Sequence, residues 1–240
     1  MRISSRYLQL FLLFLCGLVG VGAIALVHPP VQAQQITQAT VVEILDGDQV
    51  YIQNRKARNN STARRGEQIR TGSARAALRL NNNAGLRLGK NSSLIVGERC
   101  VQIKRGRVLI GGQARGCLGS VVAVTRGTLY LIEQNESNIG QVTVLEGTVA
   151  VSDREDPGRP PVILREQEKV TVFPQGVLGP IEQMSVPQFS SLVQGIEELL
   201  YNFRVSLPSL EAFNNVLRDL GLTPASPAAS SSTTPIPGLW

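Results

Sequence analysis

Carboxylates are the side chains of this sequence with the most evident capacity for acid–base or metal chemistry. Asp46 and Asp48 flank Gly47, and three more carboxylates lie between residues 153 and 156. Paired carboxylates can act as general acid and base, and clustered ones can bind calcium. The first pair surrounds a glycine, so turn formation explains it better than catalysis. The second group lacks EF-hand spacing and precedes a proline, which favours a solvated turn over a calcium site.

Histidine and glycine patterns narrow the chemistry further. His28 is the single histidine, and it lies in an N-terminal segment that we expect to be removed. Its loss excludes Ser-His-Asp and Cys-His nucleophilic mechanisms, and also zinc or iron sites with histidine ligands. Gly111-Gly112 is not followed by the Lys-Ser/Thr pair and helix of a phosphate-binding loop. We therefore expect no catalytic residues, no metal site, no bound cofactor and no enzymatic activity.

The N-terminus has the pattern of a secretory signal peptide. Arg2 and Arg6 precede an apolar run from Tyr7 to Val27, and Val31-Gln32-Ala33 is a small-residue cleavage pattern. We expect residues 1–33 to be removed and the rest to be periplasmic or extracellular. The alternative is an uncleaved membrane anchor with the bulk of the chain outside, because about 20 apolar residues are enough to span a bilayer.

Cys100 and Cys117 are the two cysteines that remain after residue 33, and they bracket one copy of a repeated strand unit. An even pair in an oxidising compartment predicts a disulfide. Closing a loop of about 15 residues would stabilise the fold by on the order of 3 kcal/mol. The alternative is two buried free cysteines that act as small hydrophobic residues.

Positive charge is concentrated in the first part of the chain. Residues 34–120 contain 15 lysines and arginines against 5 acidic residues, whereas residues 121–240 contain 7 against 13. Side chains alternate along a strand, so Arg79 and Arg87 are predicted to line one basic surface. Such a surface can bind an anionic polymer or anionic lipid headgroups, and an ordinary solvated arginine-rich face is the alternative. The candidate polyanion-binding residues are Arg55, Lys56, Arg58, Arg64, Arg65, Arg79 and Arg87.

These residues must be positioned by strands, because the sequence contains four copies of a strand–bend–strand unit of about ten residues. Val121–Leu131 is the clearest copy, with apolar alternation on both sides of a glycine. The charge beside the glycine differs between copies, so we interpret the glycine as a structural bend and the charge as variable. The four predicted bends are Gly47, Gly106, Gly127 and Gly147.

Helical spacing appears only after Pro187. One apolar stripe runs from Phe189 to Phe203, and a second runs from Leu210 to Leu220. We expect both helices to pack on the β module, since an exposed stripe of this size invites aggregation. The alternative is that they dock a partner.

The predicted fold is therefore all-β, a short solenoid or a sandwich of stacked β-hairpin repeats, with a C-terminal pair of amphipathic helices and a disordered tail. The predicted segments are a signal peptide at 1–33, a flexible lead at 34–40, a β domain at 41–173, a helical appendage at 174–221, and a Pro/Ser-rich tail at 222–240.

Five ordered segments of the β domain resemble the FecR domain. They lie at 66–80, 85–94, 124–128, 144–149 and 166–172. The resemblance covers about residues 40–173 and implies an extracytoplasmic all-β module. The named members of this family are iron-uptake regulators with a cytoplasmic anti-sigma segment, one membrane helix and this domain outside. Only six residues precede the apolar run here, so we expect a secreted relative without direct anti-sigma activity.

Two functions follow from these observations. We expect a non-enzymatic binding or scaffold module of the bacterial envelope, which contacts an anionic glycan, a lipid surface or a protein partner through a basic β face. The alternative is a signalling component related to the FecR regulators, held in the membrane by an uncleaved N-terminal helix. Nucleic acid is not an expected partner, because the compartment is wrong and aromatic stacking residues are scarce. The sequence sets neither the ligand nor the oligomeric state.

Overall fold

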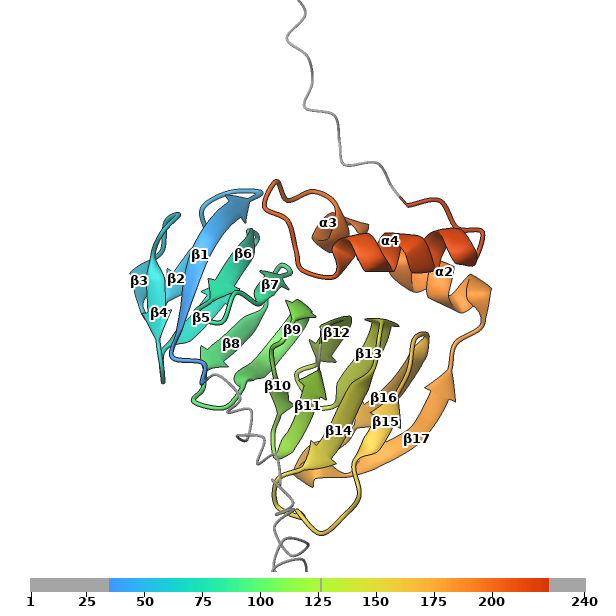
Figure 1. Ribbon diagram of the computed structural model, residues 1–240. Coiled ribbons are helices and arrows are strands. Elements are labelled where there is room, and N and C mark those ends of the chain that lie inside the picture. The colour runs from blue at the N-terminus through green and yellow to red at the C-terminus, as the bar shows by residue number, and fades with distance from the viewer. Residues whose placement is uncertain (1–34, 126, 225–240) are drawn as a thin grey trace, which may run out of the picture. The chain divides into compact units, whose positions relative to one another are not determined.

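The computed structural model describes residues 35–125 and 127–224. The predicted signal peptide, Arg126 and nearly all of the predicted tail lie outside these residues. The described strands form one continuous hydrogen-bonded system of 17 strands that is folded into two layers. Figure 1 shows the strands stacked across the molecule from β1–β4 at one end to β17 at the other, with the helices lying along one side of the stack. The structure is therefore all-β with C-terminal helices, as predicted.

The layer next to the helices, sheet A, has nine strands that are all antiparallel to their neighbours. Their order is β4 (Thr62–Arg64), β1 (Gln38–Leu45), β6 (Arg75–Leu80), β7 (Gly85–Leu88), β9 (Val101–Gly112), β12 (Thr128–Gln134), β13 (Gly140–Glu146), β16 (Glu168–Val172) and β17 (Leu178–Gln183). The hairpin of β6 and β7 turns at the asparagine-rich segment, where Asn83 adopts a φ of 64°. Asparagine tolerates this left-handed conformation, which explains why the segment turns there.

The second layer, sheet B, shares β9 with sheet A. Its strands in order are β3 (Arg55–Lys56), β2 (Val50–Ile52), β5 (Gln68–Thr71), β8 (Ser93–Val96), β9, β10 (Gly116–Leu118), β11 (Val121–Thr125), β14 (Val149–Asp153) and β15 (Val162–Leu164). The pair of β9 and β10 is parallel and the other pairs are antiparallel. The beginning of β9 pairs within sheet B and its end pairs within sheet A.

The four repeated glycines lie where the chain passes from one sheet to the other. Gly47 separates β1 from β2, Gly106 lies inside β9, Gly127 separates β11 from β12, and Gly147 separates β13 from β14. Their φ angles are 126°, 82°, 67° and 84°. A residue with a Cβ rarely adopts such backbone angles. Glycine at these positions therefore lets the chain bend between the two layers. The repeated sequence unit therefore corresponds to one crossing between the sheets.

Two apolar cores separate three layers. The first lies between the sheets and contains Leu78, Ile103 and Val144. The second lies between the outer face of sheet A and the helices, where Leu109 and Leu131 of the strands belong to the same cluster as helical side chains such as Phe189, Phe213 and Leu217. The Phe189 and Phe213 rings meet edge to face at 6.3 Å. The helices therefore pack on the β module, which confirms the favoured prediction.

The C-terminal layer consists of α2 (Val186–Gly195), α3 (Glu197–Leu200) and α4 (Leu210–Asp219), after a short 3₁₀ turn, η1 (Pro174–Gly176). Ser185 begins α2 with its N–H donated to the Gln188 side chain at 2.8 Å, as in a capping box. The first predicted stripe is split, because Ile196 leaves helical geometry with a φ of −122°. Among the helices of the described residues, none has the length and apolar character needed to cross a membrane.

Two segment boundaries differ from the predicted ones. β1 begins at Gln38, and the preceding Ile36 is buried, so part of the predicted lead belongs to the sheet. Asn81 holds this segment by accepting the Thr37 N–H at 2.9 Å and donating to the Gln35 carbonyl at 2.8 Å. At the other end, β17 extends sheet A into the predicted helical appendage. Both contacts are long-range or made at a sheet edge, so local sequence patterns do not reveal them.

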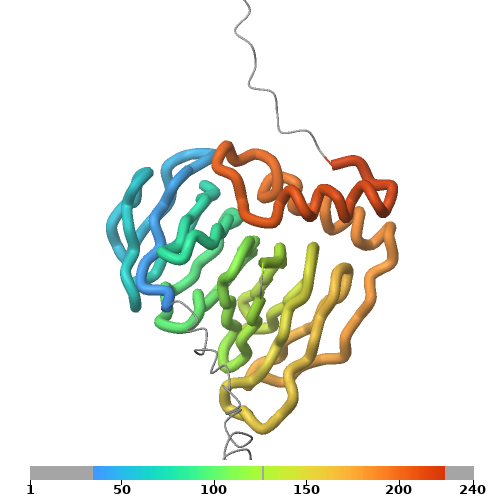
Figure 2. Tube along the Cα trace, in the orientation of Figure 1, coloured from blue at the N-terminus to red at the C-terminus, as the bar shows by residue number. Residues whose placement is uncertain are grey.

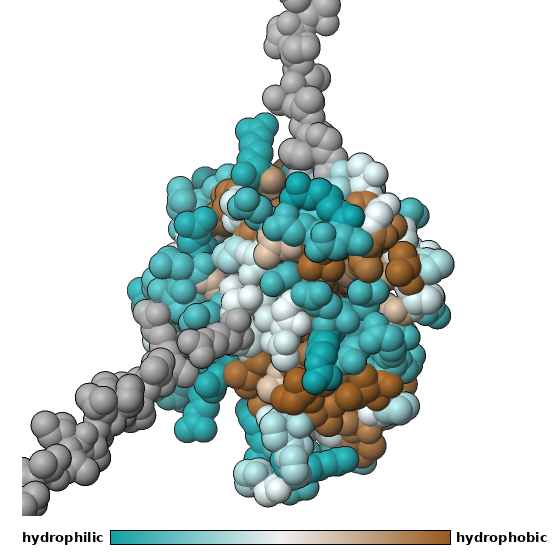
Figure 3. All heavy atoms as spheres, turned by 45° about the vertical axis from the view of Figure 1, so that its right-hand side comes forward, coloured by the Kyte–Doolittle hydropathy of each residue, from teal (hydrophilic) through white to brown (hydrophobic). Residues whose placement is uncertain are grey.

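Apolar side chains reach the surface beside the last strands. Phe173, Val177 and Ile181 are 42%, 55% and 46% exposed. Figure 3 brings the side of β17 forward and shows apolar atoms gathered in bands between polar regions. Pro180 lies in β17 and lacks an N–H group, which weakens this edge as a template for another strand.

Candidate functional site

Seven exposed cationic side chains gather at the N-terminal end of the strand stack. They lie in the first three strands of each sheet or in the loops that join those strands. We call this surface the basic end, and its members are Arg55, Lys56, Arg58, Arg64, Arg65, Arg70 and Arg79. All but Arg70 are among the predicted polyanion-binding residues, and that role stays a prediction.

The outer face of sheet B carries a row of aligned side chains within the basic end. Strand pairing places Lys56 beside Tyr51, Tyr51 beside Arg70, and Arg70 beside Ser93. Directly paired residues point to the same face of a sheet. The Arg70 guanidinium lies over the Tyr51 ring, 4.9 Å from its centroid. The ring stabilises this placement through a cation–π contact, and the edge of the guanidinium keeps its N–H donors for another group.

The outer face of sheet A carries two further members of the basic end. Arg64 is paired with Gln38 and Arg79 with Thr40. Gln38 and Thr40 are two residues apart in β1, so Arg64 and Arg79 share one face. Leu78 faces the core between the sheets, which places the adjacent Arg79 on the outside. Cations therefore surround this end of the sandwich on both of its outer faces.

Few carboxylates neutralise the basic end. Lys56 is paired with Asp48, and Arg65 lies 3.5 Å from Glu98. All four of these side chains are at least half exposed, so each pair contributes little to stability and leaves the cation accessible. Within the part of the chain that the structure describes, the other five cations form no ion pair with a carboxylate.

Arg87 does not belong to this surface, and the prediction that it lines an exposed basic face is wrong. Its residue is only 2% exposed, because the C-terminal layer covers β7. The guanidinium donates to the carbonyls of Leu199, Leu200 and Val205 at 2.8, 2.5 and 2.8 Å. It also lies 5.1 Å from the centroid of the Phe203 ring. Burial lowers the pKa of Arg87 to about 10, so the side chain is still charged at neutral pH.

Arg75 is a second buried arginine of sheet A. Its Nε and Nη2 donate to the Asp46 carboxylate at 2.5 and 3.0 Å, and Nη1 donates to the Glu198 carbonyl. These hydrogen bonds lower the pKa of Asp46 and raise that of Arg75. Asp46 itself has a φ of 63° beside Gly47. The carboxylate pair of the sequence therefore belongs to a turn, as predicted, and one member also anchors an arginine.

A reciprocal contact from the sheet holds the backbone that follows α3. The Glu43 carboxylate accepts the N–H groups of Arg204 and Val205 at 2.9 and 3.1 Å. Figure 2 shows the C-terminal segment returning to the first strand at this point. Arg107 donates to the Gly195 carbonyl at 2.8 Å, near the end of α2. Cationic side chains thus meet carbonyls at helix ends, where the helix dipole favours positive charge.

Sequence reasoning missed the covered part of sheet A, although one signal was present. Gly85 and Gly111 are paired across β7 and β9. A Cβ at Gly85 would lie 2.8 Å from Leu207, and one at Gly111 would lie 2.3 Å from the Pro208 carbonyl oxygen. Glycine inside a strand often marks a close approach of another backbone. These two glycines mark where the 207–208 segment crosses the sheet.

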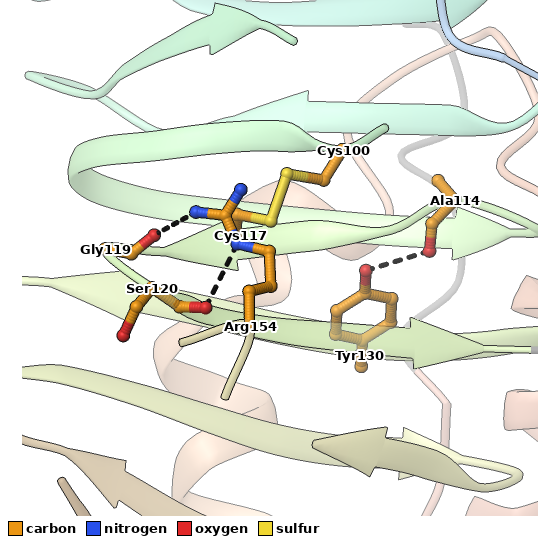
Figure 4. The surroundings of a disulfide bond; sticks show 7 residues. All are labelled: Cys100, Ala114, Cys117, Gly119, Ser120, Tyr130 and Arg154. Atoms are coloured by element: carbon orange, nitrogen blue, oxygen red, sulfur yellow. Dashed lines mark hydrogen bonds between the residues drawn. A yellow bond between two sulfur atoms is a disulfide. The ribbon is translucent and has the colours of Figure 1, made fainter. Parts of the chain in front are cut away.

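The predicted disulfide is present. Cys100 and Cys117 have Cα atoms 5.9 Å apart and join the start of β9 to β10. A bond of this kind indicates an oxidising compartment. Figure 4 shows the bond beside Arg154, which donates to the carbonyls of Gly119 and Ser120 at 2.7 and 3.1 Å. Among the described residues, no group of three or more His, Cys, Asp or Glu side chains is placed to hold a metal ion.

The comparisons with known proteins give structural neighbours of this chain but no match in sequence. No protein-family model matches it, and neither does any curated protein. Two crystal structures of a candidate anti-sigma factor from Parabacteroides distasonis, at 1.65 and 2.50 Å resolution, align with a TM-score of 0.40 and 14% identity. Each alignment covers 64% of this chain, and 92% or 91% of the other. The resemblance to the FecR domain therefore stays a prediction from the sequence.

Proposed function

We propose that this chain is a non-enzymatic binding module of the bacterial envelope that holds an anionic polysaccharide at the basic end. The observation that carries the proposal is the gathering of seven exposed cations, five of them without a carboxylate partner in the described residues. The disulfide supports a location outside the cytoplasm.

The distribution of the cations favours a flexible polymer over a flat membrane. Lys56 and Arg70 lie on the outer face of sheet B, and Arg64 and Arg79 lie on the outer face of sheet A. A planar lipid surface reaches one of these faces at a time. A polysaccharide with a negative charge on each repeat can pass around the end of the sandwich and contact both.

The ionic contacts that we propose are individually weak, because the charges are exposed to water. Each contact between an exposed arginine and a carboxylate or sulfate contributes about 1 kcal/mol or less, so affinity requires several contacts on one polymer. Salt screens such contacts, with a Debye length of about 8 Å at physiological ionic strength. Binding should therefore weaken steeply as salt is added.

The test measures binding of the disulfide-bonded protein to a carboxylated polysaccharide, alginate, by titration calorimetry from 20 to 500 mM NaCl. The variant replaces Arg64, Arg70 and Arg79 with glutamine. A control variant makes the same change of charge at exposed arginines outside the basic end, namely Arg159, Arg165 and Arg204.

We expect the basic-end variant to bind at least tenfold more weakly at low salt and the control variant to bind within threefold of the parent protein. An equal loss in both variants would show that net charge alone drives binding. An affinity for alginate that does not change with salt would also refute the proposal. So would binding to anionic phospholipid vesicles but not to alginate.

A further inference from the structure

A cavity of about 240 Å³ lies on the outer face of sheet A, at the segment that joins α3 to α4. Figure 1 shows this segment lying beside β1, β6 and β7. The sheet contributes Val42, Ala77 and Gly85 to the wall, and the segment contributes residues 205–208. Arg79 of the basic end also lines the cavity, so the cavity and the charged surface are continuous.

The segment closes the cavity on the side of β9. A Cβ on Gly85 would lie 2.8 Å from Leu207 and 2.9 Å from Pro208, so the segment rests directly on the sheet here. The Pro208 carbonyl oxygen would lie 2.3 Å from a Cβ on Gly111, the residue paired with Gly85 in β9. The segment therefore leaves no room for a ligand to continue over β9.

The cavity is also closed toward α3. The Arg87 side chain, which lines it, donates to the Val205 carbonyl at 2.8 Å, and the Glu43 carboxylate accepts the Val205 N–H at 3.1 Å. These contacts hold the wall in place, so it needs little ordering when a ligand binds. With these two sides closed, a polymer can place a terminal unit in the cavity but cannot run through it toward β9 or α3.

The polar side chains of the cavity are accessible. Arg79, Asn83 and Ser206 each line it, and all three residues are exposed to solvent. Within the described part of the chain, Arg79 pairs with no carboxylate, and the Asn83 amide and the Ser206 hydroxyl form no hydrogen bond. A guanidinium donates only, whereas an amide and a hydroxyl both donate and accept. The cavity thus offers one cation and two hydrogen-bonding groups to a ligand.

The rest of the lining is largely apolar. Val42 and Pro208 are half-buried, and Ala77 closes the wall between them and the sheet. A ligand that uses every group present combines a carboxylate, hydroxyls and an apolar face. A uronate, which is a sugar ring with a carboxylate, has all three, because its C–H groups form apolar patches. The planar guanidinium of Arg79 matches a carboxylate with two parallel hydrogen bonds.

We propose that this cavity binds the terminal uronate unit of an anionic polysaccharide, with the carboxylate on Arg79 and the hydroxyls on Asn83 and Ser206. The volume lies below the range of about 300–1,000 Å³ that is typical for drug-sized ligands, which suits a single sugar unit. The inference rests on the proposed function and deepens it, because it assigns recognition of a chain end to one part of the basic end.

The polymer can continue from the cavity to the next cation of the same face. Arg64 and Arg79 lie on opposite sides of β1, paired with Gln38 and Thr40. Their Cα atoms are about 12 Å apart, from a spacing of about 4.8 Å between strands and a rise of about 3.4 Å per residue. Arg64 is therefore placed to contact a later charged unit of a chain whose end is in the cavity.

The test titrates the isotope-labelled, disulfide-bonded protein at pH 7 and 50 mM NaCl with three small probes. They are the methyl glycoside of mannuronic acid, neutral methyl mannoside and butyrate. NMR follows the side-chain amide of Asn83 and the backbone amide of Ser206. We expect saturable shifts with the mannuronide, and binding at least fivefold weaker with the mannoside, which lacks the carboxylate, and with butyrate, which lacks the hydroxyls.

Two variants and one control locate the site. Ser206→Phe narrows the mouth of the cavity without changing a charge, and Asn83→Gly removes the amide at a φ of 64° that glycine tolerates. Ser73→Phe makes the first change at an exposed serine outside the cavity and the basic end. In calorimetry with a mannuronate hexamer, Ser206→Phe should bind at least fivefold more weakly and Asn83→Gly at least threefold. Ser73→Phe should bind within twofold of the parent protein.

Three outcomes would overturn the inference. They are the absence of saturable shifts with the mannuronide, equally tight binding of the mannoside or butyrate, and equal affinity of Ser206→Phe and Ser73→Phe for the hexamer. Calorimetry of long alginate with the variant that lacks Arg64, Arg70 and Arg79 shows separately whether the proposed function holds. Salt-dependent binding that is lost in that variant would leave the polysaccharide module intact while the terminal-unit site fails.

Discussion

Replacement of Arg87 by methionine tests how the helical layer is held on sheet A. The guanidinium donates to three backbone carbonyls, those of Leu199, Leu200 and Val205. Hydrogen bonds from a charged donor contribute about 1.5–3 kcal/mol each, so the gross loss is about 4.5–9 kcal/mol. Removing the buried charge also relieves its desolvation penalty, which is several kcal/mol. We therefore expect Arg87→Met to lower the free energy of unfolding by about 3 kcal/mol.

Arg79→Met is the matched control, because Arg79 lies on the neighbouring strand of the same sheet and is exposed. A surface substitution of this kind should change the free energy of unfolding by no more than about 0.5 kcal/mol. Urea unfolding at pH 7 gives both values, and hydrogen exchange of residues 199–207 shows whether the loss is local. Equal stability of the two variants would refute the assignment of Arg87 as the anchor. Arg87→Lys should fall between them, because an ammonium cannot reproduce the fork of donors.

Three further predictions concern a carboxylate, the disulfide and a bend. Hydrogen bonds from Arg75 lower the pKa of Asp46, so the stability from this pair is present above the unfolded-state pKa of about 3.9 and is lost as the pH falls through the lower folded-state value. Asp46→Asn should flatten the decline in stability between pH 5 and pH 2, measured by urea unfolding, and an unchanged decline would contradict this. Reduction of the bond between Cys100 and Cys117 should lower the free energy of unfolding by about 3 kcal/mol, and identical urea curves with and without reductant would contradict it. Gly127→Val should lower the melting temperature more than Gly127→Asn, because asparagine tolerates the φ of 67° at this position better than a β-branched residue; equal melting temperatures would argue against a conformational role.

The strands and bends were predictable from the sequence because they depend on local patterns. The alternation around Gly147 and the asparagine-rich turn before Gly85 report backbone conformation within a few residues. The bends do not reveal which face of each strand is inside. Val122 and Val124 follow the repeated apolar pattern, yet they are half-buried, while Val121 and Ala123, which alternate with them along the strand, are buried.

The candidate site was predictable only in part, and two arginines show why. Arg79 and Arg87 have the same side chain and lie on paired strands. The first is exposed and the second is buried, because a segment more than 100 residues later covers only one of them. Arg70 was a recognisable cation, but its place over Tyr51 depends on the pairing of β2 and β5. Counting charges along the sequence locates a basic region. The folded arrangement is needed to tell its exposed arginines from the buried ones that hold the helical layer.

The contact between Glu43 and the backbone at Arg204 has a consequence for the timing of folding. It joins residues 161 positions apart, whereas β6 and β7 or β12 and β13 pair across short turns. The entropy of loop closure delays contacts between distant residues, so the short hairpins should form first and this contact last. A contact that is absent from the transition state does not speed folding, but its loss speeds unfolding. The helical layer thus acts on the lifetime of the folded β module rather than on the rate at which it assembles.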